Sequence, residues 1–318
     1  MTSFILRRLL LGIPTLLSTT LILFLLFNVL PGQDPAVLMA GKHATPETIA
    51  SIQKEYGLDK SLPMQYVALL KQVVTFDFGR SFKSKEKISE ILMRGAPVSF
   101  WLTAPPFFLT TIFAVLVAFV LAIFRGTWVD KSIVSFCVGA QSVSIIVYIL
   151  AMQYFLAYYP KVQWGKQYFP ISGYEPGWVE RWHYLALPWI ILLAISIAPE
   201  IRYYRTVVLD ELYQDYVRTG RAKGLGTRMI MLKHVLKNAM IPIITNTVLA
   251  IPFLLLGTFA IESFFSIPGI GDISVQAIVN NDRPMLIAVT VFGTVAFIIF
   301  NIISDVMYAL VDPRVQLK

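Results

Sequence analysis

The stretch DYVRTGRAKGLGTRMIMLKHVLKNAMIPI, from Asp215 to Ile243, decides the fold because it gathers positive charge in a chain that is 56% hydrophobic. It has a Gly-Leu-Gly sequence near its middle and no acidic residue after Asp215. A segment of this kind must lie in water or against a polar partner, so the apolar sequences around it determine its place. Its basic residues before the final apolar run are Arg218, Arg221, Lys223, Arg228, Lys233 and Lys237.

The composition indicates a membrane protein. Only 14% of the 318 residues are charged, and the mean hydropathy is +0.67, both unusual for a soluble domain. The apolar run after Arg7 and Arg8 is long enough to cross a bilayer and lacks a small-residue cleavage site, so we interpret it as a retained first span. The net charge of +8 indicates basic residues collected on the cytosolic side rather than nucleic-acid binding.

Six apolar segments are long enough to cross the bilayer, which takes roughly 20 helical residues. The predicted fold class is therefore an all-α membrane protein with six transmembrane helices. Six crossings place both termini on one side, and Arg7 and Arg8 make that side the cytosol. The predicted spans are about 9–30, 97–124, 132–158, 184–204, 239–262 and 285–311.

This topology divides the chain into three parts. Residues 1–30 form an N-terminal span, residues 31–95 an external helical segment, and residues 96–318 the transmembrane domain. The basic stretch then lies in a cytosolic loop at about 205–238, as the excess of lysine and arginine there requires.

The external segment is expected to be helical. Thr45 can cap a helix that starts at Pro46 and ends before Gly57. A second helix follows Pro63, and SKEKISEILMRG is predicted to be an amphipathic elbow. Its apolar face would consist of Ile88, Ile91 and Leu92.

A search for catalytic or ligand-binding motifs yields none. The sequence has no phosphate-binding loop, no G-x-S-x-G nucleophile motif and no H-E-x-x-H or clustered cysteines. His43, His183 and His234 fall in three separate loops. We therefore predict no catalytic residue, no metal site and no cofactor bound by this chain itself.

Several polar residues lie within or at the ends of the predicted spans. Glu200, Glu262 and Asp305 are close to span ends, so we expect interhelical hydrogen bonds or salt bridges rather than a proton relay. The fifth span is interrupted by prolines and can bend to line a wet path, although small and hydroxyl residues also serve tight helix packing. The predicted pathway-lining residues are Thr245, Asn246, Thr247, Pro252 and Gly257.

The residues before the Gly-Leu-Gly sequence have helical spacing. Apolar side chains recur on one face of an amphipathic helix, which is expected to end near Gly224 and Gly226. A second amphipathic segment, TRMIMLKHVLKNAM, leads back to the membrane at Pro242. The pattern indicates either a stiff helical projection or a solvated loop that follows the positive-inside rule. The apolar face comprises Leu209, Leu212, Tyr213, Tyr216 and Val217.

The same region resembles the cytosolic motif of the inner-membrane permease subunits of peptide-type ABC importers. Their recurring D-Y-V-R-T-A-R-A-K-G-L run corresponds to Asp215–Leu225, and the following H-A-L-x-N-A-L-I-P run to His234–Pro242. The resemblance covers nearly the whole chain, through RRLLLGIPTLL, YGLDKSLPMQY, FDFGRSF, FFSIPGIGDISVQAI and SDVMYALVDPRV. It departs from the family at Gly220, where alanine is usual, and at NNDRP before the sixth span.

The resemblance implies a type I permease fold and an import mechanism of alternating access. The implied partners are a second homologous permease, two ABC ATPase subunits that bind ATP and Mg, an external substrate-binding protein and membrane lipid, with no nucleic acid. The implied location is the cytoplasmic (inner) membrane of a prokaryote, with several spans. The implied ATPase-coupling residues are Tyr216, Arg218, Arg221, Ala222, Lys223, Gly224 and Leu225, with His234 and Asn238 supporting the return helix.

The function implied is import of dipeptides or oligopeptides, with nickel, glutathione or another small ligand as alternatives for the same machinery. A self-sufficient secondary transporter would need inverted repeats or a charge relay near the midplane, and neither is visible in the sequence. A membrane enzyme would need the nucleophile or metal cluster that the motif search did not find.

Overall fold

The computed structural model describes residues 2–30, 34–40 and 45–311. These residues form helices and turns, with one isolated β-bridge between Arg80 and Lys87, so the all-α class is confirmed. Short π- or 3-10-helical segments are marked η. The helices are α1 (Thr2–Phe24), η1 (Leu25–Val29), α2 (Pro35–Ala40), α3 (Pro46–Tyr56), α4 (Leu62–Thr75), α5 (Ile88–Ile123), α6 (Trp128–Gln141), α7 (Ile145–Met152), η2 (Gln153–Tyr158), α8 (Tyr159–Trp164), α9 (Trp178–Leu212), α10 (Asp215–Ala222), α11 (Thr227–Met229), η3 (Ile230–Val235), α12 (Leu236–Ala250), η4 (Ile251–Leu254), α13 (Phe259–Phe265), α14 (Ile270–Val279) and α15 (Arg283–Val311).

Six helical segments of the described chain are long and apolar enough to cross a membrane, which confirms the predicted number of spans. Those built on α1, α5, α9 and α15 agree with prediction, although α5 and α9 extend well beyond the predicted ends. The third segment differs from the prediction of 132–158, because the helical stretch able to cross is Ile145–Trp164, and residues 142–144 separate it from α6. The fifth ends early, at Leu254 instead of residue 262.

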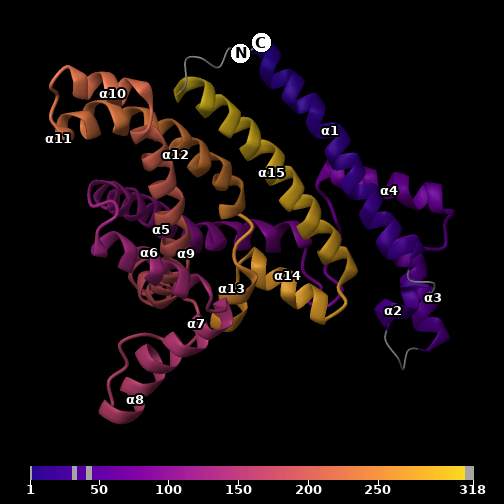
Figure 1. Ribbon diagram of the computed structural model, residues 1–318. Helices are drawn as coiled ribbons and strands as arrows, with labels where there is room; N and C mark the ends of the chain where they lie inside the picture. The colour runs from indigo at the N-terminus through magenta and orange to yellow at the C-terminus, as the bar shows by residue number, and fades with distance from the viewer. Residues whose placement is uncertain (1, 31–33, 41–44, 312–318) are drawn as a thin grey trace.

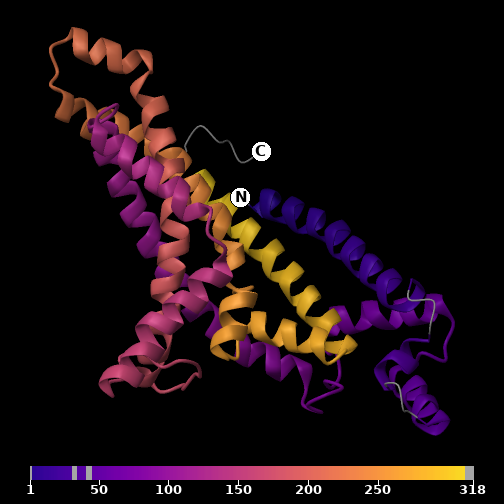
Figure 2. The same cartoon turned by 60° about the horizontal axis from the view of Figure 1, so that its bottom comes forward.

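The helices place their ends at two opposite poles of the molecule. The start of α1, the end of α15 and the α10–α11 hairpin lie towards one pole, whereas α2, α3 and α8 lie towards the other (Figure 1). The view in Figure 2 shows the same separation. This arrangement is the one expected for an even number of crossings, with the basic loop on the side of both chain ends.

The segment before α5 largely follows its sequence signals. Thr45 caps α3 by accepting a hydrogen bond from the backbone N–H of Thr48, at 3.3 Å, and Gly57 ends the helix with φ +64°. The predicted elbow is wrong as a separate element, because residues from Ile88 onward are the first turns of α5. Its apolar face is nevertheless inward, since Ile88 and Leu92 are fully buried.

The interior consists of several apolar clusters that follow the axis of the molecule. One, near the α10–α11 pole, joins α5, α6, α9, α10 and α12, and includes Leu121, Tyr204 and Val235. A second joins α7 to α5, α9 and α13 around Leu102 and Ile149. A third packs α1 and α4 against the start of α5, α14 and α15. The long helices α5 and α9 pass through more than one cluster and form the central pair.

A buried carboxylate organises the chain where the fifth span ends. After η4 the chain turns at Gly257 and enters α13, which carries Glu262 into a fully buried position. Its carboxylate accepts hydrogen bonds from the Ser99 hydroxyl at 2.9 Å and from the backbone N–H groups of Thr258 and Asp272, each at 3.1 Å. These donors stabilise the carboxylate and join α5, α13 and α14, so the predicted interhelical hydrogen bonding of Glu262 is confirmed.

The other two acidic residues differ from one another. Asp305 forms an ion pair with Arg8 at 3.1 Å, which joins α15 to α1 as predicted. Glu200 lies on α9 near Thr111 of α5, but its Oε2 atom is buried without a hydrogen-bond partner. The expected pairing is therefore confirmed for Asp305 and is incomplete for Glu200.

The glycine at the turn can be tested directly. A Cβ atom at Gly257 would lie 1.9 Å from Oε1 of Glu262, and the backbone there has φ +70°. Gly257→Ala should therefore clash with the carboxylate and also carry about 1–2 kcal/mol of left-handed backbone strain. Gly165→Ala is the matched control, because Gly165 has φ +63° and open space around the same position. We expect thermal unfolding in detergent to show a clearly larger loss of stability for Gly257→Ala. Equal losses would contradict the role assigned to the carboxylate contact.

Candidate functional site

The basic stretch forms a helical hairpin that projects from one pole of the molecule (Figure 1). The single amphipathic helix predicted to end near Gly224 is in fact two, because α9 ends at Leu212 and Gln214 adopts an extended conformation before α10. Gly224 then takes φ +79° and reverses the chain. The projection is thus ordered and helical, as the first of the two sequence interpretations predicted.

The hairpin is held to the rest of the molecule by an apolar core. Val217 of α10 and the return-segment residues Ile230, Met231 and Val235 are each at most 3% exposed and belong to the same cluster as Leu121. Such close packing couples α10 to the adjacent helices. At Gly220, where the family usually has alanine, either residue fits. A Cβ atom there would meet its nearest side chains at 3.6 Å, an ordinary contact distance.

The predicted coupling residues fall into two groups. Arg218, Arg221 and the turn around Gly224 are exposed, and the ion pair of Arg218 with Asp215, at 3.6 Å between two strongly exposed side chains, contributes little. The exposed group is thus available to a partner; it comprises Arg218, Arg221, Ala222, Lys223, Gly224 and Leu225.

The second group faces inward. Tyr216 donates a hydrogen bond to Glu211 at 2.6 Å, and its ring lies 6.4 Å from that of His234. Burial, followed by the hydrogen bond to Glu211, raises the pKa of Tyr216 to about 12, while Asn238 near the same hydroxyl acts in the opposite direction. These contacts place Tyr216 against the return segment, where it supports the hairpin.

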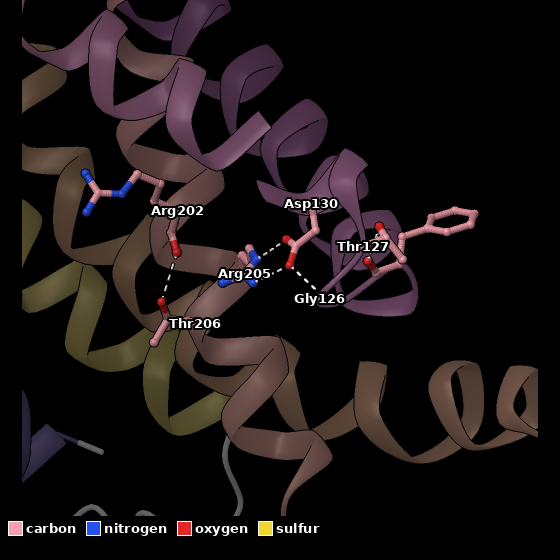
Figure 3. Close-up of polar contacts among 7 residues, drawn as sticks. Gly126, Thr127, Asp130, Arg202, Arg205 and Thr206 are labelled. Atoms are coloured by element: carbon pink, nitrogen blue, oxygen red, sulfur yellow. Dashed lines mark hydrogen bonds and ion pairs between the residues drawn. The ribbon is translucent and has the colours of Figure 1, made fainter. Parts of the chain in front are cut away.

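The base of the hairpin carries an ion pair that the sequence analysis missed. Asp130, at the start of α6, accepts two hydrogen bonds from the Arg205 guanidinium, at 2.7 and 2.8 Å, and one from the Gly126 backbone N–H at 2.9 Å (Figure 3). Next to it, the Arg125 guanidinium lies over the Tyr213 ring at 4.6 Å. Both contacts tie the turn between α5 and α6 to the segment where α9 ends. No sequence signal relates Asp130 to Arg205, because they are 75 positions apart.

The residues predicted to line a pathway lie on α12 and just beyond it. Thr245 and Thr247 are half-buried, and their hydroxyls donate to the carbonyls of Ile241 and Ile243 on their own helix. Asn246 is half-buried, Pro252 is buried in η4, and Gly257 packs against Glu262. The packing alternative thus accounts for Gly257, and the pathway role of the others stays a prediction.

Six helical segments able to cross a membrane, with a basic helical hairpin at one pole, indicate a multi-pass helical membrane protein. The comparisons with known proteins are more specific. Residues 111–317 match the family described as binding-protein-dependent transport system inner membrane component, and residues 1–103 match its N-terminal family. The chain belongs to this family, the inner-membrane permeases of ABC importers with the type I permease fold.

Curated relatives match over the full length of the chain. A Brucella abortus protein, provisionally named a peptide transport system permease protein, is 33% identical over 99% of both chains. The glutathione transport system permease protein of Pectobacterium atrosepticum is 33% identical over 100% of both chains. A protein of the same name in Salmonella choleraesuis is 32% identical, again over 100% of both.

The Asp130–Arg205 pair generates a stability prediction. Asp130→Ala would leave the mostly buried Arg205 without its carboxylate, so we expect a loss of about 3 kcal/mol, towards the low end of the range for broken buried pairs. Asp215→Ala, which breaks the exposed pair with Arg218, is the matched control and should cost under about 0.5 kcal/mol. Denaturant unfolding in detergent measures both, and similar losses would contradict the assignment.

The same pair has a defined pH dependence. The hydrogen bonds from Arg205 hold the pKa of Asp130 below its ordinary value. Because the pKa is lower in the folded state, the ionised carboxylate stabilises the folded protein at pH values above the unfolded-state pKa of about 3.9. This stabilisation is lost as the pH falls from there through the folded-state pKa. The stability difference between wild type and Asp130→Ala should therefore be constant from pH 7 to 5 and shrink only below about pH 4.

Proposed function

We propose that this chain is one of two homologous permeases in an ABC importer for dipeptides or oligopeptides, with glutathione or another small ligand such as nickel as the alternative. Two ATPase subunits would bind the cytosolic face, and an external binding protein would deliver the ligand. The names of the peptide and glutathione relatives support this class of substrate. A secondary transporter has no such support from either relative.

The α10–α11 hairpin is the observation that carries the coupling role. It is ordered, exposed on its outer surface and packed on a core shared with four other helical elements of the transmembrane region. A rigid element of this kind can transmit closure of the ATPase subunits as a tilt of the spans, whereas a loose loop would absorb the motion. Its basic side chains would orient an acidic partner surface more than they add affinity.

The mechanism that we propose is alternating access. ATP binding would draw the hairpins of the two permeases together and open the cavity outward, and hydrolysis would reset it. All chemistry of ATP and Mg belongs to the ATPase subunits. The contribution of this chain is mechanical, through the hairpin and through the ion pair at its base, which joins α6 to α9.

Substitution at the hairpin tip tests this proposal. Gly224→Trp adds a large side chain at an exposed turn with no atom within 4 Å of the new Cβ, so the chain should insert normally while ATPase association and uptake fall to background. Gly165→Trp is the matched control, with φ +63° and equally open space but on the external side. Co-purification with the ATPase subunits and uptake into cells are measured. Normal uptake by Gly224→Trp would exclude the coupling role.

Sidedness is a separate prediction. Both termini and the hairpin are proposed to be cytosolic, with the segment before α5 outside. A cysteine replacing Ser84 should react with an impermeant thiol reagent applied to spheroplasts, whereas a cysteine replacing Thr227 should be protected until the membrane is opened. Both positions are exposed, so access to the compartment alone decides the outcome. Reversed labelling would invert the topology.

A further inference from the structure

A hollow opens where the two central helices begin. Its walls come from the first turns of α5, from the start of α9 with the loop before it, and from the turn between α13 and α14. Its volume is about 650 Å³, within the range of roughly 300–1,000 Å³ that is typical of small-ligand sites. The residues that line it include Met93, Arg94, Val98, Trp101, Tyr174 and Arg181.

The sequence places this hollow at the edge of two apolar runs. Lysine, arginine, aspartate and glutamate are absent between Arg94 and Arg125 on α5, and between Arg181 and Glu200 on α9. Arg94 and Arg181 therefore stand at the starts of two segments that are able to cross a membrane, where long basic side chains reach the polar interface. Under the proposed topology both helices start outside, so the hollow is on the side from which the ligand arrives.

Arg181 has hydrogen-bond donors without a partner. Its Nη2 donates to the Pro176 carbonyl at 3.0 Å, which fixes the guanidinium to the loop before α9. Its Nε is buried without a hydrogen-bond partner, and no ion pair among the described residues involves this side chain. Glu175, next to Pro176 in the sequence, instead accepts from the Tyr184 hydroxyl at 3.2 Å. Unpaired buried donors are costly, and an acceptor supplied by a ligand would remove that cost.

Arg94 gives the hollow a second positive charge. Its ion pair with Glu86 joins side chains that are 67% and 52% exposed, and exposed pairs of this kind contribute little to stability. A ligand carboxylate can therefore compete for Arg94 at small cost. A guanidinium carries five donors in a planar fork and binds a carboxylate through two parallel hydrogen bonds.

The remaining walls are apolar and closely packed. Trp101 and Tyr174 provide aromatic surfaces, and Val98 lies on the same part of α5 as Trp101. Gly95 lets α5 approach α14, because a Cβ atom there would lie 2.6 Å from Cδ1 of Ile273. Such contact holds the walls in place before a ligand binds, which lowers the cost of ordering them.

We propose that the hollow is an external binding site for a short peptide, in which Arg181 and Arg94 bind the terminal carboxylate and the apolar walls hold the side chains. This inference rests on the proposed function. The ligand would occupy the hollow after its release from the binding protein and before it crosses the membrane. Walls that this chain supplies on three sides suit a compact ligand better than a lipid with two acyl chains.

Protection of an engineered thiol tests whether a peptide occupies the hollow. Met93 lines the hollow and is 66% exposed, whereas Met64 on α4 is 63% exposed and lies outside it. Met93→Cys and Met64→Cys, each combined with Cys137→Ala to remove the single native cysteine, form a matched pair. In the complex in phosphatidylcholine nanodiscs without binding protein, dialanine and trialanine should slow the reaction of a charged methanethiosulfonate at position 93 only. Their C-terminal amides should protect about tenfold less well, and equal or absent protection would overturn the site.

Substitution of Arg181 tests the carboxylate contact in the same assay. Arg181→Gln should raise the half-protecting concentration of the free acids about tenfold or more, and Arg181→Lys, which keeps the charge, should raise it less. The advantage of acid over amide should disappear in Arg181→Gln, whereas a merely structural loss would weaken both alike. Arg80→Gln is the matched control, because Arg80 also donates to a carbonyl, that of Lys85 at 3.0 Å, outside the hollow. Unchanged protection in Arg181→Gln would overturn the proposal.

Two further measurements separate the alternatives. Native mass spectrometry of the complex from its host membrane would overturn the peptide site if a phospholipid were retained by the unaltered chain and lost in Arg181→Gln. Uptake of the same peptides by the unaltered complex with its binding protein tests the proposed function itself. Uptake without protection at position 93 would overturn the site alone, whereas failure of the unaltered chain to assemble with ATPase subunits would count against the proposed function.

Discussion

The requirement that backbone polar groups be satisfied at membrane depth shapes this protein more than any single contact. Continuous helix meets the requirement along α1, α5, α9 and α15. Where a span deviates from helix, side chains from elsewhere replace the missing partners. Thr103 of α5 donates to the Leu254 carbonyl at the end of η4 at 2.6 Å, and Glu262 accepts from the backbone beyond it. The three-helix contact around Glu262 is therefore a consequence of ending the fifth span within the protein.

Two irregularities of the helical path differ in how far this chain encloses them. The turn around Gly257 is enclosed by Ser99, Glu262 and α14, so its polar groups are satisfied within this chain. The interruption between α6 and α7 is only partly enclosed and presents polar side chains outward. The Gly257 turn thus joins several elements of this chain, whereas the segment between α6 and α7 makes mainly local hydrogen bonds.

Side-chain contacts connect the hairpin to both ends of α6. The hairpin shares its core with α5, α6 and α9, and Asp130 and Arg205 join the start of α6 to α9 just before the hairpin. Arg202, one helical turn from Arg205, contacts Gln141 at the other end of α6. Both ends of α6 are therefore joined to α9, the helix that precedes the hairpin.

Local sequence determined much of this architecture. Six apolar segments, the Thr45 cap, the Gly57 and Gly224 reversals and the amphipathic hairpin follow from hydropathy, spacing and glycine conformation, which act over a few residues. The resemblance in Asp215–Pro242 also identified the family, because the order of its motifs is specific. The inward position of Tyr216 was not visible, since its spacing suits either a buried face or a partner surface.

Tertiary structure decided what depends on contacts between distant residues. The carboxylate of Glu262 requires Ser99 and the start of α14, Asp130 requires Arg205, and Gln141 requires Arg202. Apart from the start of α14, which is 10 positions from Glu262, these partners are 61 to 163 positions apart, and hydropathy carries no information about such pairing. The break in the predicted third span was hidden for a related reason: residues 142–144 lie within a run that favours helix, whereas in the structure α6 and α7 pack in two different clusters.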